Sequence, residues 1–310
     1  MQETPFVIDV KNLVVEYGKG KKKQRAVDGI SFRITQGECV GFIGANGAGK
    51  TTTIKVLMGF LFPQKGEVRV FGNKAGTVES RKRLGYLPEV ALYYPFMKAR
   101  ELLELYGGLH GLTKKSLGEK IPKLLQKLGL EGKGEILLKH FSKGMQQRLG
   151  IAQAIIADPE ALIFDELSSG LDPLGRFELR NVLLDLKKKG RTIFFSSHEL
   201  TEVENLCDRV IMIHKGRIVT EASVKDLMKP LNIFEIIFEF PDEKSLPEEV
   251  SRFSPNKQQG LYKLVISNVD DYSRAVSALA RSGAAIHNTS SRSRSLEQYF
   301  IELVEKEKSL

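Results

Sequence analysis

One stretch of the chain restricts its possible folds more than any other. The run Cys39–Ile43 is apolar throughout, as expected of a strand that is covered on both faces in a parallel sheet. It leads straight into the glycine-rich segment Gly44–Thr51 (GANGAGKT), and Ile54, Leu57 and Met58 then follow at helical spacing. A buried strand, a phosphate-binding loop and a helix in this order predict a nucleotide-binding α/β core.

The chemistry of this loop follows from its residue types. Glycines let the backbone curl around phosphate oxygens with its N–H groups pointing inward, where a β-carbon would obstruct. Lys50 is expected to contact the β- and γ-phosphates and the Thr51 hydroxyl to bind Mg²⁺, while the helix N-terminus adds favourable dipole charge. The residues expected to hold the nucleotide here are Gly44, Ala45, Asn46, Gly47, Ala48, Gly49, Lys50, Thr51 and Thr52.

Two carboxylates follow another apolar strand. Asp165 and Glu166 come directly after Leu162–Phe164, an arrangement in which the first carboxylate holds the hydration shell of Mg²⁺. Glu166 can then point at the γ-phosphate and polarise an attacking water as a general base. Together with the loop, this pair still leaves kinases, GTPases and helicases open.

Three further segments distinguish between these classes of nucleotide-binding protein. Ser142 is placed as an N-cap in the segment Phe141–Arg148 (FSKGMQQR), which precedes an apolar helix, and with Gly144 beside it this helix start can bind a phosphate. Since the chain already has one phosphate loop, a second such site makes sense if it serves a neighbouring molecule. His198, at the end of a later strand, can donate a hydrogen bond to the γ-phosphate. Gly170–Pro173 has the composition of a turn placed to signal between the sites.

Hydrophobic patterns divide the chain into regions. Phe6, Ile8 and Val10 alternate with polar residues and predict half-buried antiparallel strands. Helical spacing between about residues 99 and 128 predicts a helical insertion. The strand and helix patterns that follow predict a mostly parallel α/β core.

A new alternating strand begins around Lys229–Pro230, so we expect a domain boundary there. Residues 230–310 are predicted to form a small α+β accessory or regulatory domain, in which Ser290–Ser295 is loop surface. No motif occurs twice, which indicates one nucleotide-binding unit in the chain.

The order and separations of these segments resemble those of the ATPase subunit of an ATP-binding cassette (ABC) transporter. The resemblance rests on GANGAGKT, FSKGMQQR, ALIFDE, SGLDP and SSHEL, and it covers roughly residues 6–228. It implies a P-loop NTPase (RecA-like) core with an antiparallel β-subdomain and a helical subdomain at about residues 90–145, all within an ATPase domain at residues 1–229.

The resemblance also implies how the protein works. ATP is expected to close two cassettes head to tail, as a homodimer, with Ser142 and Gly144 of one copy over the γ-phosphate held by the other. Tyr17 is expected to stack on the adenine ring. Hydrolysis at Glu166 is expected to reopen the dimer and to drive a separate membrane permease.

This sequence departs from the common family pattern at several positions. Glu89 stands where many members carry a glutamine that reaches Mg²⁺ and the attacking water, and a glutamate there can still accept from water. Lys143 and Met145 replace glycine and glutamine of the commonest signature, and Lys143 brings positive charge towards the shared γ-phosphate. Leu167 stands where a proline often follows the catalytic glutamate. With the carboxyl-terminal extension, these features are similar to bacterial or archaeal drug-, antibiotic- and sodium-exporter ATPases.

Bulk properties bear on where the protein works. No run of about 18 apolar residues occurs, and the first residues lack the basic and apolar regions of a secretory signal. Cys39 and Cys207 lie far apart and have no metal or redox spacing, which fits a reducing compartment. We expect a cytoplasmic protein that sits on the inner face of the cell membrane through its permease.

Other functions of the same fold are open to this sequence. The net charge of +9 favours an anionic partner, but no aromatic residues interleave with the basic cluster Lys19–Arg25, so we expect no nucleic acid partner. A soluble ABC ATPase acting on ribosomes, DNA or protein assembly is the main alternative, although such proteins often fuse two cassettes or insert long coiled coils. A P-loop kinase is a third possibility, and it gives no reason for Ser142 or His198.

Overall fold

The computed structural model describes residues 6–18, 23–168, 170–228, 230–241, 245–258, 260–293 and 295–308. These residues cluster in two compact units that divide between Val224 and Lys225. The sequence places a domain boundary a few residues further on, after Lys229. Each unit encloses its own cluster of buried apolar side chains. Most of the basic cluster Lys19–Arg25 lies outside the described residues.

An antiparallel sheet with the strand order β2-β1-β4-β5 begins the first unit. Its first two strands pair Ile8 with Ile34 and Val10 with Phe32, and all four side chains are buried. The alternating apolar residues therefore point into the core, as the sequence predicts. The strands are β1 (Phe6–Tyr17), β2 (Gln24–Thr35), β4 (Lys65–Val70) and β5 (Asn73–Lys74).

The central sheet has the strand order β10-β9-β3-β8-β7-β6. Strands β9, β3, β8, β7 and β6 are parallel to their neighbours within this run, whereas β10 pairs antiparallel with β9. Every residue of β3 and β7 is buried, which explains their apolar runs. The strands are β3 (Cys39–Ile43), β6 (Leu84–Leu87), β7 (Ala161–Phe164), β8 (Thr192–Ser197), β9 (Arg209–His214) and β10 (Arg217–Ser223).

This strand order brings three loops together. Strand β8 lies between β3 and β7, with Ile43 opposite Ser197 and Phe164 opposite Phe195. Because parallel strands end at the same edge of a sheet, the residues that follow these three strands meet there. They are the glycine-rich loop, the Asp165–Glu166 pair and His198.

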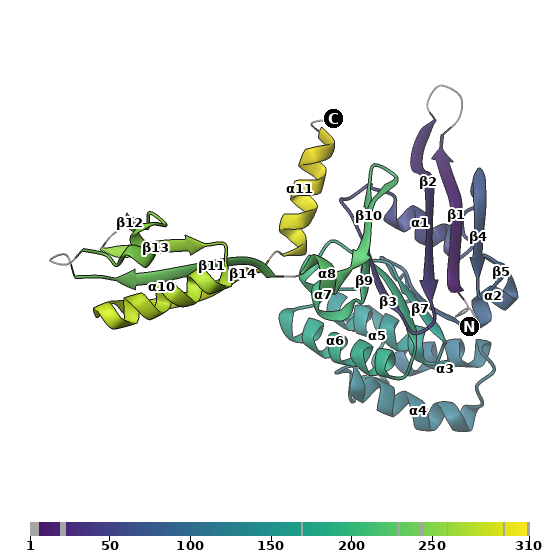
Figure 1. Ribbon diagram of the computed structural model, residues 1–310. Coiled ribbons are helices and arrows are strands. Elements are labelled where there is room, and N and C mark those ends of the chain that lie inside the picture. Colours follow the sequence, from purple (N-terminus) through teal and green to yellow (C-terminus); the bar gives the residue numbers. More distant parts are fainter. Residues whose placement is uncertain are drawn as a thin grey trace, which may run out of the picture. The chain divides into compact units, whose positions relative to one another are not determined.

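Helices α3 and α4 pack beside α5, on the side of this unit away from β1 and β2 (Figure 1). Helix α4 buries Leu117, Ile121, Leu124 and Leu125, the positions whose spacing predicts a helix. Among the described residues, no helix combines the length and apolar character needed to cross a bilayer. The helices are α1 (Lys50–Leu57), α2 (Val78–Lys82), α3 (Ala99–Leu109), α4 (Lys114–Lys127), α5 (Lys143–Ile155), α6 (Pro173–Lys188), α7 (Leu200–Leu206) and α8 (Val224–Leu227), with a 3₁₀ turn, η2, at Leu138–His140.

The second unit has the expected α+β composition. Its sheet has the order β12-β13-β11-β14, and α10 packs on one face against Ile236, Phe238 and Leu264. The prediction that Ser290–Ser295 is loop surface is wrong for its first residues, because β14 pairs with β11 as far as Ser293. The elements are β11 (Pro230–Glu239), α9 (Glu248–Ser251), β12 (Asn256–Gln258), β13 (Leu261–Ile266), α10 (Val269–Ser282), β14 (Ala285–Ser293) and α11 (Leu296–Lys308).

Candidate nucleotide site

The glycine-rich loop between β3 and α1 packs too closely against its neighbours for larger residues. A β-carbon at Gly44 would lie 2.3 Å from the carbonyl oxygen of Ile213, and one at Gly49 would lie 2.6 Å from that of Ala26. Gly49 also has a φ of +113°, where residues with a side chain are strained. Neither position therefore has room for a β-carbon, and Gly49 also needs a backbone conformation that only glycine adopts without strain.

The ammonium group of Lys50 lies inside this loop. Lys50 is the first residue of α1 and is only 6% exposed. Its Nζ donates hydrogen bonds to the carbonyl oxygens of Gly44, at 2.7 Å, and Ala45, at 3.3 Å. These carbonyl dipoles hold a positive charge at the centre of the loop, beside the N-terminus of a helix, which is a setting that suits a phosphate group.

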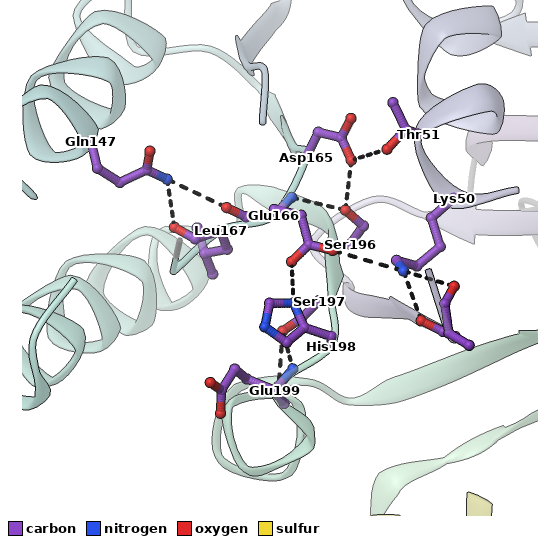
Figure 2. Close-up of polar contacts among 12 residues, drawn as sticks. Lys50, Thr51, Gln147, Asp165, Glu166, Leu167, Ser196, Ser197, His198 and Glu199 are labelled. Carbon is purple, nitrogen blue, oxygen red and sulfur yellow. Dashed lines mark hydrogen bonds and ion pairs between the residues drawn. The ribbon is translucent and has the colours of Figure 1, made fainter. Parts of the chain in front are cut away.

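The first carboxylate of the pair is held by two hydroxyl groups (Figure 2). The side chains of Thr51 and Ser196 donate to Oδ1 of Asp165 at 3.1 Å and 2.8 Å. Burial raises the pKa of Asp165, the charges of Glu89 and Glu166 raise it further, and the two hydroxyl hydrogen bonds oppose the shift. A cation beside Asp165 would offset the cost of burying its charge.

The oxygen atoms at this point fit a magnesium ion that arrives with a nucleotide. The Thr51 hydroxyl and the Asp165 carboxylate are in contact. Within the described ranges, no group of three or more His, Cys, Asp and Glu residues is placed to hold a metal ion. Mg²⁺ usually takes one or two carboxylates and completes its shell with water and substrate phosphates. A Mg²⁺ ion bound by Thr51 and Asp165 would therefore take the rest of its shell from water and nucleotide phosphates.

Glu166 is held by contacts to its side chain and to its backbone. Nδ1 of His198 lies 2.6 Å from Oε2, and Nζ of Lys50 lies 3.8 Å from Oε1. The backbone N–H donates to Oγ of Ser196 at 2.9 Å. Glu166 is 8% exposed and has a φ of +58°, the left-handed region that residues with a side chain seldom occupy. Strained backbone of this kind persists only where the surroundings hold it.

Gln147 contacts the backbone at and after Glu166, although the sequence alone indicates no role for it. Its side-chain Nε2 donates to the carbonyl oxygen of Leu167 at 2.9 Å and to that of Glu166 at 3.4 Å (Figure 2). Gln147 is 6% exposed, on the otherwise mostly apolar buried face of α5. A polar residue on such a face is a signal in the sequence, but its partners are 19 and 20 residues away along the chain.

A cavity of about 240 Å³ lies against the glycine-rich loop. Glu89, which follows β6, enters its wall together with the loop and Glu166. Tyr17 is 44% exposed and its hydroxyl lies 3.3 Å from Oγ1 of Thr52, so its side chain reaches the edge of the same loop. The residues that line the cavity are Asn46, Gly47, Gly49, Lys50, Thr51, Thr52, Glu89 and Glu166.

Ser142 and Gly144 do not line this cavity. Ser142 is exposed, and its hydroxyl caps α5 by accepting a hydrogen bond from the N–H of Met145 at 3.2 Å. A β-carbon at Gly144 would lie 3.2 Å from the carbonyl oxygen of Gly170, so the start of α5 packs tightly on that turn. The chain therefore keeps these two residues outside the cavity of its own loop.

Comparison with known proteins decides the family. The family model described as ABC transporter matches residues 27–169. An uncharacterized ABC transporter ATP-binding protein of Nostoc sp. is 34% identical over 99% of this chain and 92% of its own length. The chain belongs to the ABC transporter ATP-binding proteins.

Two further members of this ABC family carry more specific names. The bacitracin transport ATP-binding protein BcrA of Bacillus licheniformis is 34% identical over 96% of this chain and 97% of its own length. The Nod factor export ATP-binding protein I of Paraburkholderia xenovorans is 35% identical over 76% of this chain and 80% of its own. The similarity to BcrA therefore extends into the C-terminal unit of this ABC protein.

Solved structures of ABC cassettes share the fold. The structure of an ATP binding subunit of an ABC transporter has a TM-score of 0.65 and 32% identity, and covers 72% of this chain and 92% of that chain. A dimeric cassette in a post-hydrolysis state, bound to ADP and Pi, has a TM-score of 0.64 and 22% identity, with 70% and 98% covered. The predicted P-loop α/β fold is confirmed, and this ABC protein is an ATP-binding subunit and an ATPase.

Proposed function

We propose that this ABC protein hydrolyses MgATP to drive export through a separate membrane permease, and that it does so as a pair of cassettes. The observation that supports this most directly is the meeting of the Lys50 ammonium, the Thr51–Asp165 contact and the Glu166–His198 pair beside one cavity. The names of the relatives in bacitracin transport and Nod factor export support the exporter role.

In this proposal, the glycine-rich loop binds the phosphates, and Thr51 and Asp165 bind the metal ion. Lys50 and the N-terminus of α1 would bind the β- and γ-phosphates. Thr51 and Asp165 would hold Mg²⁺, with Glu89 at the same cavity as a further oxygen donor. The ion, when bound, neutralises charge on the phosphate oxygens. Its positive charge would also relieve the repulsion between Asp165 and its neighbouring carboxylates.

In this proposal, Glu166 accepts the proton of the attacking water. A carboxylate that points into the phosphate cavity can accept the proton of an attacking water as general base. His198 holds this carboxylate by donating from Nδ1, and only its doubly protonated imidazolium can also donate from Nε2 to the γ-phosphate. Nζ of Lys50 lies 3.8 Å from the same carboxylate and forms an ion pair with it.

A second copy of the chain would complete each site. The exposed Ser142 and the half-buried Gly144 form a helix start that lies outside the cavity of their own chain. In a head-to-tail homodimer they would close over the γ-phosphate held by the partner, and Lys143 would add positive charge there. The dimeric form of a solved cassette with the same fold supports this arrangement.

A groove lined by apolar side chains and also by Lys55, Arg81, His110 and Gln153 supports a permease partner. It has a volume of about 620 Å³, and Leu92 beside it is 91% exposed. Exposed apolar groups of this kind on a soluble unit mark interaction sites. Pro88 lines the groove and the next residue, Glu89, lines the nucleotide cavity, so one short segment touches both sites. The apolar lining includes Met58, Phe60, Leu84, Tyr86, Leu92, Tyr93 and Tyr106.

The remaining parts of the proposal concern place and domains. Docking through this groove would hold the protein on the inner, cytoplasmic face of the cell membrane. We assign residues 1–229 to the ATPase domain, with a helical subdomain at about residues 90–145 that contains α3 and α4. Residues 230–310 are assigned to an accessory or regulatory domain, which the separate core of the second unit supports.

Placing a charge in the groove tests the permease partner. Leu92→Asp is expected to reduce recovery of the ATPase with cell membranes at least about tenfold, because the aspartate would have to lose its hydration in an apolar contact. The ATPase rate of the isolated protein should stay within about twofold, since Leu92 does not line the nucleotide cavity. Val269→Asp, at another exposed apolar side chain, is the matched control. Recovery with ribosomes or DNA at physiological salt, in place of a membrane protein, would contradict the proposal.

The adenine contact of Tyr17 can be measured separately. Tyr17→Ala is expected to raise KM for ATP about tenfold, because stacking of a base on an aromatic ring contributes about 1–3 kcal/mol. Tyr17→Phe keeps the ring and loses only the contact to the Thr52 hydroxyl, so its KM should stay near that of the unmodified protein. Equal KM values for all three proteins would remove Tyr17 from the nucleotide site.

A further inference from the structure

The backbone of Glu166 is held at consecutive peptide groups. Its N–H donates to Ser196 at 2.9 Å, and the N–H of Leu167 donates to the carbonyl oxygen of Ser196 at 3.4 Å. Its own carbonyl oxygen and that of Leu167 both accept from the side chain of Gln147. Ser196 therefore fixes one side of this strained turn, and Gln147 fixes the other.

A primary amide matches these two carbonyl groups. Carbonyl oxygens only accept hydrogen bonds, so the nitrogen of the Gln147 carboxamide must face them, and its two N–H groups can serve one carbonyl each. Gln147 is 6% exposed, so water does not readily replace it there. It also does not line the nucleotide cavity. Its contacts act on the backbone that carries the carboxylate and not on the nucleotide.

We propose that Gln147 is a positioning residue for ATP hydrolysis, because it holds the Glu166–Leu167 backbone in the conformation that directs the Glu166 carboxylate into the cavity. This inference rests on the role proposed above for Glu166. Gln147 lies on α5, the helix that Ser142 caps. A shift of α5 when Ser142 meets the partner's nucleotide would therefore be passed directly to the backbone of Glu166 in the same chain.

Gln147→Met tests the proposal, since methionine has a similar length and no donor. The variant is expected to lower kcat by about 10- to 100-fold, because a displacement of about 1 Å at a reacting group costs up to about 10²-fold. KM for ATP should stay within about twofold, as expected when a change affects only the hydrolytic step. Gln146→Met is the matched control, because the Gln146 amide donates to the carbonyl oxygen of Phe141 at 3.4 Å, away from the carboxylate pair.

A double variant separates positioning from general damage. When Glu166→Gln has already removed the general base, adding Gln147→Met should change the slow residual rate by less than about twofold, because residues that act through one group are not additive. The same 10- to 100-fold loss in both backgrounds would overturn the proposal, and so would a normal kcat in folded Gln147→Met.

A second substitution covers the case in which the first one disturbs folding. Gln147→Glu keeps the size of the side chain and replaces the donor with an acceptor, so it should also lower kcat with little change in KM. Loss of folding or of ATP affinity in both variants would assign Gln147 a purely structural role and overturn the proposal. A Glu166→Gln variant that hydrolyses ATP normally would instead remove the function proposed for Glu166.

Discussion

Replacing Glu166 with glutamine is expected to lower the turnover of ATP by about 10²- to 10⁴-fold, the range typical of losing a general base. The change preserves the size of the side chain but removes its ability to take a proton from water. Lys50 and Thr51 stay in place, and the variant lacks the negative charge that would face the γ-phosphate. ATP affinity should therefore be unchanged or increased. Phosphate release measures the turnover, and a fluorescent ATP analogue measures the binding.

The control for this experiment is a glutamate of the same chain that is far from the cavity. Glu119→Gln changes an exposed residue of α4 and should leave both quantities unaltered. If the Glu166→Gln protein released phosphate at the normal rate, the proton acceptor would have to be another group. If it failed to bind ATP, the Glu166 carboxylate would be needed for the structure of the loop.

Ser142→Asp is expected to prevent ATP-dependent pairing of two cassettes and to lower hydrolysis by about 10²- to 10³-fold. Aspartate is as good an N-cap as serine, so α5 should keep its start. Its carboxylate would face the partner's γ-phosphate, and two like charges about 4 Å apart repel by about 4 kcal/mol at an effective dielectric constant of about 20. Light scattering with and without ATP measures the pairing.

Ser142→Asn serves as the matched control, because asparagine also caps a helix and carries no charge. A mixture of the Ser142→Asp and Glu166→Gln proteins provides a stronger test. A mixed pair contains one site with the intact Glu166 of one copy and the intact Ser142 of the other, so the mixture should hydrolyse more ATP than the two proteins measured separately. Full activity of Ser142→Asp as a monomer would contradict the shared site.

Much of the candidate site could be predicted because its parts are short and adjoin strands. The loop that ends in Lys50 and the pair Asp165–Glu166 each follow an apolar strand in the sequence. Parallel strands end at one edge of a sheet, so the meeting of these groups follows from the predicted fold. The roles predicted for Glu89 and Tyr17 come from the family resemblance alone, since neither residue belongs to a motif with a chemistry of its own. The structure places both beside the loop.

The C-terminal unit shows where pattern reasoning fails. The composition of the serine- and arginine-rich stretch from Ser290 predicts loop surface. This stretch is nevertheless the end of edge strand β14, where Ser290 lies opposite Glu235 and Ser291 opposite Phe234. The backbone hydrogen bonds of an edge strand come from its neighbour, so exposed polar side chains can occupy it. The identity of those residues therefore carries little information about the strand.

The sequence by itself determined the phosphate loop and the carboxylate pair, because each depends on residues that are adjacent in the chain and on local backbone preferences. The order and spacing of these and the other motifs also predicted the family. Only the tertiary structure decided that Gln147 reaches the carbonyl groups of Glu166 and Leu167, that Glu166 has a left-handed backbone, and that a groove and the nucleotide cavity share the segment at Pro88–Glu89. These features depend on distances between segments that are remote in sequence, and such distances are set by how helices and strands pack rather than by any local pattern.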